Sequence, residues 1–283
     1  FEAVPDEMLD ATQSFLGMDG VKHSGLRKLV SSVFTPRQVA KIKGQIENQA
    51  RVIVDDLLKT TDGDFVEQVS KRLPMWTLYE MLGLPEDQRE EAAHHADGMV
   101  AWADPDVAAG REPSEVLTDS LVGLLGIGIG LAEQRRAKPE SDLMTSLVQA
   151  EVDGRRLTDD EIGPFFVLLS VAGNDTTRTT TTFTTLALQQ FPEQKVLLQN
   201  DFDGHIKPAM EEFVRWTTPV MTFRRTATQD TELGGQHVRE GDWVTMVYSS
   251  ANRDERVFTN PNVFDITRSP NPHVAFGGGG PHY

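Results

Sequence analysis

The sequence predicts a mainly helical fold with a small β region near its C-terminal end. Apolar residues recur at helical spacing over most of the chain, as expected for helices with one buried face. Residues 222–248 instead have the composition of strands and contain a two-residue glycine turn, Gly234-Gly235. The uncharged run 165–172 must lie inside the protein, because no face of such a helix could point to water. We therefore expect the fold to be arranged around one long buried helix.

The expected elements follow in order along the chain. Residues 1–20 predict a loop with one short helix at most, and the Pro-, Gly- and Asp-rich run 103–113 predicts a mobile surface connection. Helices are expected over residues 21–34, 36–60, 65–84, 86–102, 114–136, 141–151, 158–190 and 206–216, with Ser141 as the cap of the sixth. The strands of residues 222–248 come next, and an irregular segment rich in Pro, Asn and Gly ends the chain.

The long helix has recognisable ends. Thr158 followed by Glu161 is a capping box, which satisfies orphan amides at a helix start, and Pro192 marks the end. At a rise of about 1.5 Å per residue, the helix would be roughly 48 Å long, enough to cross a whole domain. Gly163-Pro164 predicts either a kink near the beginning of the helix or a true start at Pro164.

The middle of this helix changes chemistry abruptly. Ala172 and Gly173 carry almost no side chain and leave room for a flat or bulky ligand against the helix. Asp175 and Thr176 place an acid and a hydroxyl beside that room, a combination suited to moving protons. The alternative is a helical turn loosened by glycine, in which Asp175 and the threonines hydrogen-bond the preceding carbonyls. On this segment alone, both interpretations stay open.

Composition limits the possible partners. The formal net charge of −16 argues against nucleic acids and anionic membranes, both of which attract basic surfaces. The chain has no cysteine, which excludes disulfides, thiol nucleophiles and cysteine-based metal sites within these residues. No apolar run approaches the ~20 residues of a membrane span, so we expect an acidic, cytoplasmic protein. The acidic start without an initiator Met suggests a fragment.

Three spaced motifs, taken together in this order, resemble the cytochrome P-450 superfamily of haem-thiolate monooxygenases. They are AGNDTT at 172–177 in the buried helix, EEFVR at 211–215 in a later helix, and NPHVAFGGGGPHY at the end. Each motif alone is common, since E-x-x-R pairs are usually solvated and glycine runs are usually linkers. Their joint order, with HSGLR at 23–27 upstream and FRRTATQD at 223–230 between them, is specific. The likeness covers nearly the whole chain.

The resemblance implies a single partial haem-thiolate monooxygenase domain over residues 1–283, with haem b as its cofactor. The family's axial iron ligand is a cysteine expected directly after Tyr283, where the sequence stops, so these residues supply no metal ligand. The resemblance also implies an N-terminal part and a later helix outside this chain. We interpret the chain as truncated at both ends and inactive by itself; a haem-free relative is the alternative.

The family's functional residues map onto positions that match its motifs. Ala172 and Gly173 match the oxygen-activating groove, with Asp175 gating protons and Thr176 holding a hydrogen-bonded water. The residues expected to contact the haem carboxylates are His23, Arg27, Arg225, His273 and His282. The residues expected to face the substrate are Leu168, Val171, Val220 and Met221. The residues expected to form a buried structural charge network are Glu212, Arg215 and Arg268.

Within the superfamily, the sequence most resembles bacterial enzymes that hydroxylate terminal methyl groups of sterol side chains and methyl-branched lipids. This resemblance implies a monooxygenase that inserts one atom of molecular oxygen into an unactivated C–H bond of an apolar, lipid-like substrate. A ferredoxin-type electron donor is expected to dock near Arg27, Lys28 and Arg37, because an acidic ferredoxin is attracted by positive charge. The alternatives are a non-catalytic haem or small-molecule binder of the same fold and a peroxide-driven haem enzyme.

Overall fold

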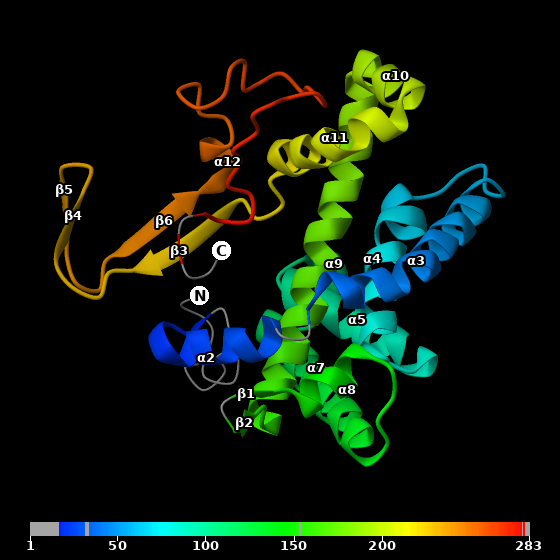
Figure 1. Ribbon diagram of the computed structural model, residues 1–283, viewed down its shortest axis with the longest axis vertical. Helices are drawn as coiled ribbons and strands as arrows, with labels where there is room; N and C mark the ends of the chain where they lie inside the picture. The colour runs from blue at the N-terminus through cyan, green and yellow to red at the C-terminus, as the bar shows by residue number, and fades with distance from the viewer. Residues whose placement is uncertain (1–16, 32–33, 153, 279, 281–283) are drawn as a thin grey trace. The chain divides into compact units, whose positions relative to one another are not determined.

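The computed structural model describes residues 17–31, 34–152, 154–278 and 280 of the chain. Helices dominate and the strands are short, which confirms the predicted mainly helical class (Figure 1). The chain forms two compact units, residues 1–178 and 179–283, and the boundary falls within the long helix α9 (Asp159–Gln190). The single domain expected over residues 1–283 stays a prediction.

The first unit is a series of helices with one short hairpin. Its helices are α2 (Gly20–Ser31), α3 (Pro36–Leu57), α4 (Arg72–Leu82), α5 (Glu86–Ala101), α6 (Pro105–Ala108), α7 (Pro113–Ala137), α8 (Leu143–Gln149) and the first part of α9. A π-helical turn, η2 (Val66–Ser70), precedes α4, and the antiparallel strands β1 (Glu151–Val152) and β2 (Arg155–Arg156) precede α9. The long helices predicted in this part of the chain are confirmed, with ends displaced by a few residues.

Two helical features of this unit differ from the sequence prediction. The run 103–113 contains α6, whose N-cap Asp104 accepts a hydrogen bond from the Asp106 amide. The sequence analysis did not predict this short helix, for which Asp104-Pro105 supplies both an N-cap and the proline favoured at a helix start. The helix predicted over residues 65–84 begins with the π-helical turn η2 and passes into α4.

Asp142, rather than the predicted Ser141, caps α8. The Asp142 Oδ1 atom accepts a hydrogen bond from the Thr145 amide at 2.7 Å, and its Oδ2 atom pairs with Arg135 of α7. Arg135 also donates from Nη2 to the Gly83 carbonyl at 2.7 Å, at the residue where α4 ends. A carboxylate can serve the helix amide and the guanidinium with separate oxygens, which explains the displaced cap.

The start of α9 follows the predicted capping box in part. The Thr158 amide donates to Glu161 Oε2 at 3.1 Å, which is one of the two hydrogen bonds of the motif. The helix begins at Asp159 and includes Pro164, so the alternative start at Pro164 was wrong. A proline removes one backbone hydrogen bond, and the apolar packing of the residues that follow offsets this loss.

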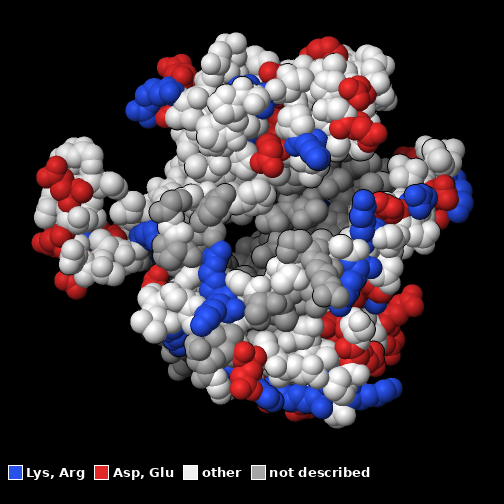
Figure 2. Space-filling model, in the orientation of Figure 1, with Lys and Arg blue, Asp and Glu red and all other residues white. Residues whose placement is uncertain are grey.

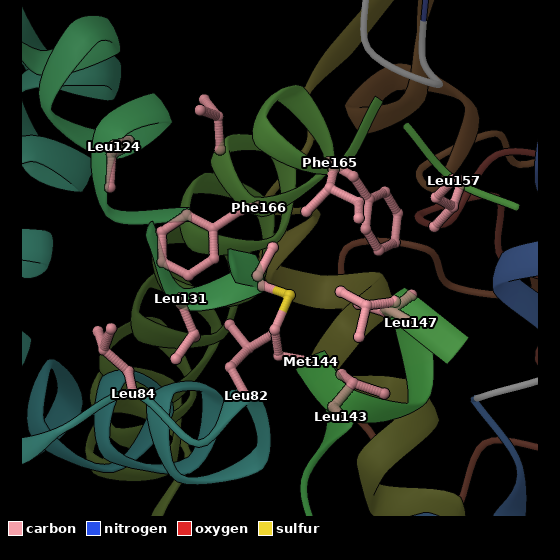
Figure 3. Packing of buried hydrophobic residues seen from close by; sticks show 14 of the residues in the cluster. Leu82, Leu84, Leu124, Leu131, Leu143, Met144, Leu147, Leu157, Phe165 and Phe166 are labelled. Atoms are coloured by element: carbon pink, nitrogen blue, oxygen red, sulfur yellow. The ribbon is translucent and has the colours of Figure 1, made fainter. Parts of the chain in front are cut away.

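The core of the first unit lies between α4, α7, α8 and the first part of α9. Phe166 of α9 and Leu131 of α7 lie side by side in this core, near Met144 of α8 and Leu82 of α4 (Figure 3). The two helices α7 and α9 approach so closely that a Cβ on Gly128 would lie 2.6 Å from the Phe166 Cβ. Glycine at this position therefore permits the contact that buries the uncharged run of α9.

Among the described residues, α7 is long and apolar enough to cross a membrane by length and composition. Its residues Leu121, Leu124 and Leu131 are buried in the core of the first unit, and the helix packs on α5 and α8. Of its most apolar stretch, 39% is buried within the protein, and one such helix is weak evidence for a membrane span because core helices share this composition.

The second unit carries the β region. After α9 its elements are α10 (Pro192–Asn200), α11 (Phe202–Thr217), β3 (Thr222–Thr226), β4 (Thr231–Leu233), β5 (Gln236–Val238), β6 (Trp243–Val247) and α12 (Tyr248–Ala251). Strand β3 pairs antiparallel with β6 along its whole length. Strands β4 and β5 form a hairpin whose turn residues, Gly234 and Gly235, both have positive φ, which confirms the predicted glycine turn.

The second unit has an aromatic core and an acidic hairpin. The Phe264 ring lies 5.6 Å from that of Phe191, 6.0 Å from that of Phe213 and 5.4 Å from that of Trp216, measured between centroids.

Acidic side chains gather on the hairpin of β4 and β5, at the left of Figure 2. The exposed acids of this hairpin and its flanks are Asp230, Glu232, Glu240 and Asp242. Part of the net negative charge is therefore concentrated in this segment.

Candidate functional site

Ala172 and Gly173 form an open surface of small residues midway along α9. Both residues are exposed. Within the described part of the chain, a Cβ added to Gly173 would meet only the Leu78 side chain, at 3.6 and 3.7 Å, which is ordinary van der Waals contact. This stretch of the helix is therefore not filled by packed neighbours, and it has room for a flat group.

Thr176 and Asp175 lie beside this surface and make different kinds of contact. The Thr176 Oγ1 atom donates a hydrogen bond to the Ala172 carbonyl at 2.7 Å, as the alternative interpretation of the segment expects. The Asp175 Oδ1 atom instead accepts from Arg178 Nη2 at 2.6 Å. Helix α9 is continuous through these residues. Arg178, on the same helix, holds the Asp175 carboxylate in place.

Asp175 belongs to a charge network of the first unit. Arg178 donates from Nη1 to Asp97 Oδ1 of α5 at 2.9 Å, and Lys71 Nζ lies 2.9 Å from Asp97 Oδ2. Burial disfavours the charge on Arg178, but the hydrogen bond to Asp175 and the charge of Asp97 hold the pKa of Arg178 above its usual value. Burial likewise opposes the charge on Lys71, and the contact with Asp97 raises the pKa of Lys71 nonetheless. Both cations therefore stay charged.

His23 and Arg27, two of the predicted haem contacts, lie one turn apart on α2. The His23 side chain is buried and Arg27 is half-buried, while Leu26, Leu29 and Val30 of the same helix pack into the core. This packing fixes the helix face on which both basic residues lie. The pair belongs to the first unit.

Arg225 and His273, the other described members of the predicted set, belong to the second unit. Arg225 of β3 is exposed, donates from Nη1 to the Arg224 carbonyl at 3.0 Å and lies 5.0 Å from the centre of the Phe223 ring. The His273 Nε2 atom lies 2.9 Å from Glu211 Oε2. His282 lies outside the described residues.

Glu212, Arg215 and Arg268 form a buried ion network in the second unit. Arg215 grips Glu212 with a fork, from Nε to Oε2 and from Nη2 to Oε1, each at 2.7 Å. Arg268 Nε adds a bond of 3.1 Å to Glu212 Oε2. Arg215 also donates from Nη1 to the carbonyls of Asn252 and Pro261. The network thus ties α11 to the irregular segment that follows α12.

The four residues expected to face a substrate have different surroundings. Leu168 and Val171 of α9 are partly buried against the core of the first unit. In the second unit, Val220 is half-buried and Met221 is exposed. Leu168 and Val171 lie on the same helix as the open surface of Ala172.

Known proteins match this chain in both sequence and structure. The family model described as Cytochrome P450 matches residues 130–279. A solved cytochrome P450 of Mycobacterium marinum, in complex with pseudoionone, is 54% identical with a TM-score of 0.93, and the match covers 99% of this chain and 68% of that one. The chain belongs to the cytochrome P450 family. The predicted resemblance is thereby confirmed.

Two curated P450 relatives match over nearly the whole chain. A steroid C26-monooxygenase of Mycolicibacterium smegmatis is 42% identical over 95% of this chain, and a methyl-branched lipid omega-hydroxylase of Mycobacterium tuberculosis is 41% identical over 98% of it. The chain spans 61% of the length of the first relative and 65% of the second. It is thus similar to part of each of these P450 enzymes.

The P450 family implies a haem, and the described residues fit one in two respects. The open surface at Ala172 and Gly173 leaves space for a flat macrocycle against α9. Within the first unit, the basic side chains of His23 and Arg27 on α2 are of the kind that binds haem carboxylates. The sequence has no cysteine, so the thiolate expected after Tyr283 stays a prediction. Within the described residues, no group of three or more His, Cys, Asp or Glu could hold a metal ion.

The sequence analysis missed several residues of the two charge networks, the one around Asp175 and the one around Glu212. Arg178 carried a signal, because an arginine three positions after Asp175 lies on the same helix face. Asp97 and Lys71 carried none, since Asp97 meets Arg178, and Lys71 meets Asp97, only through tertiary packing. Asn271 donates from Nδ2 to Glu212 Oε2 at 3.1 Å, and the motif around Glu212 does not announce this contact either.

Proposed function

We propose that the complete protein is a haem-dependent monooxygenase that inserts one atom of molecular oxygen into an unactivated C–H bond of an apolar, lipid-like substrate. The observation that carries the proposal is the acid and alcohol pair, Asp175 and Thr176, beside an open small-residue surface on α9. A protein that only bound haem would have no need for a proton-handling pair at this position. Membership of the P450 family supports the same reaction class.

The substrate class rests on the relatives and on the apolar residues that are expected to face the substrate. The matched enzymes are named for steroid C26 oxidation and for omega-hydroxylation of methyl-branched lipids. Leu168 and Val171 on α9, with Val220 and Met221 in the second unit, supply apolar surface suited to such ligands, which are held mainly by burial. The preferred substrate is a sterol side chain or a methyl-branched lipid.

Each side chain of the site has a defined task in this proposal. Haem, when bound, supplies the activation of molecular oxygen and its transfer to the substrate carbon. Ala172 and Gly173 admit the macrocycle, and His23, Arg27, Arg225, His273 and His282 bind its carboxylates. The Asp175 carboxylate, 32% exposed, takes a proton from solvent at an Oδ atom and passes it inward. The Thr176 oxygen accepts a hydrogen bond from a water molecule that carries this proton onward.

Electrons are proposed to come from a ferredoxin-type donor that docks on the basic part of α2. Arg27 is half-buried and Lys28 is exposed on this helix, whereas the side chain of Arg37 lies outside the described part of the structure. Reversing the charge at Lys28 should slow reduction by an acidic donor and lower the salt dependence of that step. An unchanged reduction rate would argue against this docking face.

Replacing Thr176 by alanine in the complete protein tests the proposed relay. Loss of the hydroxyl removes the water that carries the proton, so a larger share of the electrons should end in hydrogen peroxide and less product should form per electron consumed. The matched control is Thr177→Ala, one position along the same helix, which should leave the ratio of product to electrons unchanged. Unchanged coupling in Thr176→Ala would contradict the relay and favour a haem or small-molecule binder without turnover.

A further inference from the structure

Helices α5 and α7 approach each other closely at two glycines. A Cβ on Gly98 of α5 would lie 2.1 Å from Ser120 Oγ of α7. One helical turn away the arrangement is reversed, and a Cβ on Gly123 of α7 would lie 2.2 Å from His95 Nε2 of α5. The His95 ring therefore packs directly on the backbone of α7, in space that is open only because residue 123 has no side chain.

His95 is a poorly hydrated base at this contact, since its side chain is 18% exposed. Burial is the main cause that lowers the pKa of His95 below its ordinary value of 6.5. The His94 ring, 5.7 Å away between centroids, lowers this pKa further. The carboxylates of Glu91 on α5 and Asp119 on α7 oppose these two causes only in part. The His95 ring is therefore neutral at pH 7.

The acidic groups near the His95 ring would compensate a positive charge on it only weakly. Glu91 Oε1 lies 4.0 Å from His95 Nε2, but the Glu91 side chain is 64% exposed, so water screens its charge. Asp119 is already paired with Arg111. Helix α5 also packs on α4 and α6, and within the described part of the chain no charged group of these two helices contributes to the pKa of His95.

We propose that His95 is an acid-sensitive contact between α5 and α7. The neutral imidazole packs on Gly123 and holds the two helices together, and the protonated ring leaves this position for water, which loosens the contact. The unfolded chain binds this proton more readily than the folded chain, because the pKa of His95 is lower in the folded state. The stability that the contact contributes is therefore complete above about pH 6.5 and is lost as the pH falls below that value.

Hydrogen exchange of the complete haem protein, measured by mass spectrometry, tests this contact. Protection of the α5 and α7 amides, corrected for the intrinsic exchange rate, should fall several-fold from about pH 7.5 to about pH 5.5. In His95→Gln, whose side chain cannot become charged, that fall should be absent. The control is His94→Gln, in which the fall should remain and should begin at a higher pH. Equal falls in the unaltered protein and in His95→Gln overturn the inference.

Gly123→Ala should displace the His95 ring without acid. The new Cβ overlaps the end of the His95 side chain, which can rotate away, so the two helices need not separate. At neutral pH this variant should show the low protection that the unaltered protein shows in acid, with little further fall. The matched control is Gly126→Ala on the same helix, whose Cβ would meet nothing within 4 Å among the described residues. A Gly123→Ala protein that keeps the pH dependence of the unaltered protein overturns the inference.

Direct titration of the imidazole separates an acid-sensitive contact from a purely structural one. By NMR of the isotope-labelled ring in the complete protein, the titration midpoint of His95 should lie below 6.5. Glu91→Gln should lower the midpoint further, because the Glu91 carboxylate favours the charged ring. A midpoint at or above 6.5 in the unaltered protein overturns the inference.

Discussion

Two arginine–carboxylate networks in this chain differ in how tightly they are built. In the second unit, Arg215 grips Glu212 with two bonds of 2.7 Å, and both side chains are fully buried. In the first unit, Arg178 divides its Nη atoms between Asp175 and Asp97 on different helices, and the side chains are 19–32% exposed. The fork joins one arginine to one carboxylate, whereas the divided guanidinium joins carboxylates of two helices. The first geometry suits a fixed structural joint, and the second leaves the Asp175 carboxylate partly exposed to solvent.

The largest expected effect comes from the buried fork. Glu212→Gln leaves Arg215 and Arg268 without their shared carboxylate, and we expect the free energy of unfolding to fall by about 3–5 kcal/mol. Urea unfolding of the complete protein measures this loss. Glu211→Gln, on the same helix with an exposed side chain, is the control and should cost about 1 kcal/mol or less. If both variants lost a similar free energy of unfolding, the buried fork would not be more stabilising than the surface pair, and the prediction would be wrong.

The divided network should show its effect in rate more than in stability. Asp175→Asn removes the proposed proton acceptor, so we expect turnover to fall by about a hundredfold. The free energy of unfolding should change by only about 1 kcal/mol, because Arg178 keeps its contact with Asp97. Steady-state product formation and urea unfolding, measured on the same preparation, check both parts. A normal rate would remove Asp175 from the mechanism.

Exchanging arginine for lysine sharpens the comparison further. A lysine ammonium cannot reproduce a planar fork, so Arg215→Lys should destabilise the protein by several times more than Arg178→Lys, for which we expect about 1 kcal/mol. Unfolding measured at low and at high salt should also separate the two sites. The cost of Arg178→Lys should shrink with added salt, and that of Arg215→Lys should not, since buried pairs are screened less. A cost that shrinks with salt for Arg215→Lys but not for Arg178→Lys would contradict the assignment of Arg215 to the buried pair and Arg178 to the partly exposed one.

The smallest effect is expected at an exposed pair in the second unit. The hydrogen bonds from Arg256 lower the pKa of Asp254 to about 2, from an ordinary value of 3.8. Because the folded-state pKa lies below the unfolded one, the pair stabilises the fold above about pH 4, and this contribution is lost as the pH falls toward 2. Asp254→Asn should therefore leave the unfolding midpoint almost unchanged at pH 7. Any difference should vanish near pH 2; a difference that grows in acid would contradict the pairing.

The same contrast explains which features sequence reasoning could predict. The start of α9 at Thr158 and Glu161 and the turn at Gly234-Gly235 depend on neighbours within a few residues, so their signals are local. The cap of α8 was misplaced because Arg135, on another helix, favours Asp142 over Ser141. The break between η2 and α4 likewise has no simple local signal.

In the candidate site, too, residues close together in the sequence could be predicted and residues far apart in it could not. Asp175, Thr176, Ala172 and Gly173 form a contiguous motif, so the resemblance could nominate them together. Asp97 lies 81 residues before Arg178 and meets it only in the folded chain. No rule of sequence spacing predicts this pair, because packing of α5 against α9 brings the two side chains together.

The close approach of α7 and α9 at Gly128 also limits how this family can vary. Any side chain at position 128 would strike the Cβ of Phe166 and not merely the movable end of its ring, so a change of rotamer cannot relieve the overlap. An alanine at 128 requires either glycine at 166, the one residue without a Cβ, or a separation of the two helices. Among relatives, the identities at these two positions should therefore covary, and that record can be read from alignments alone.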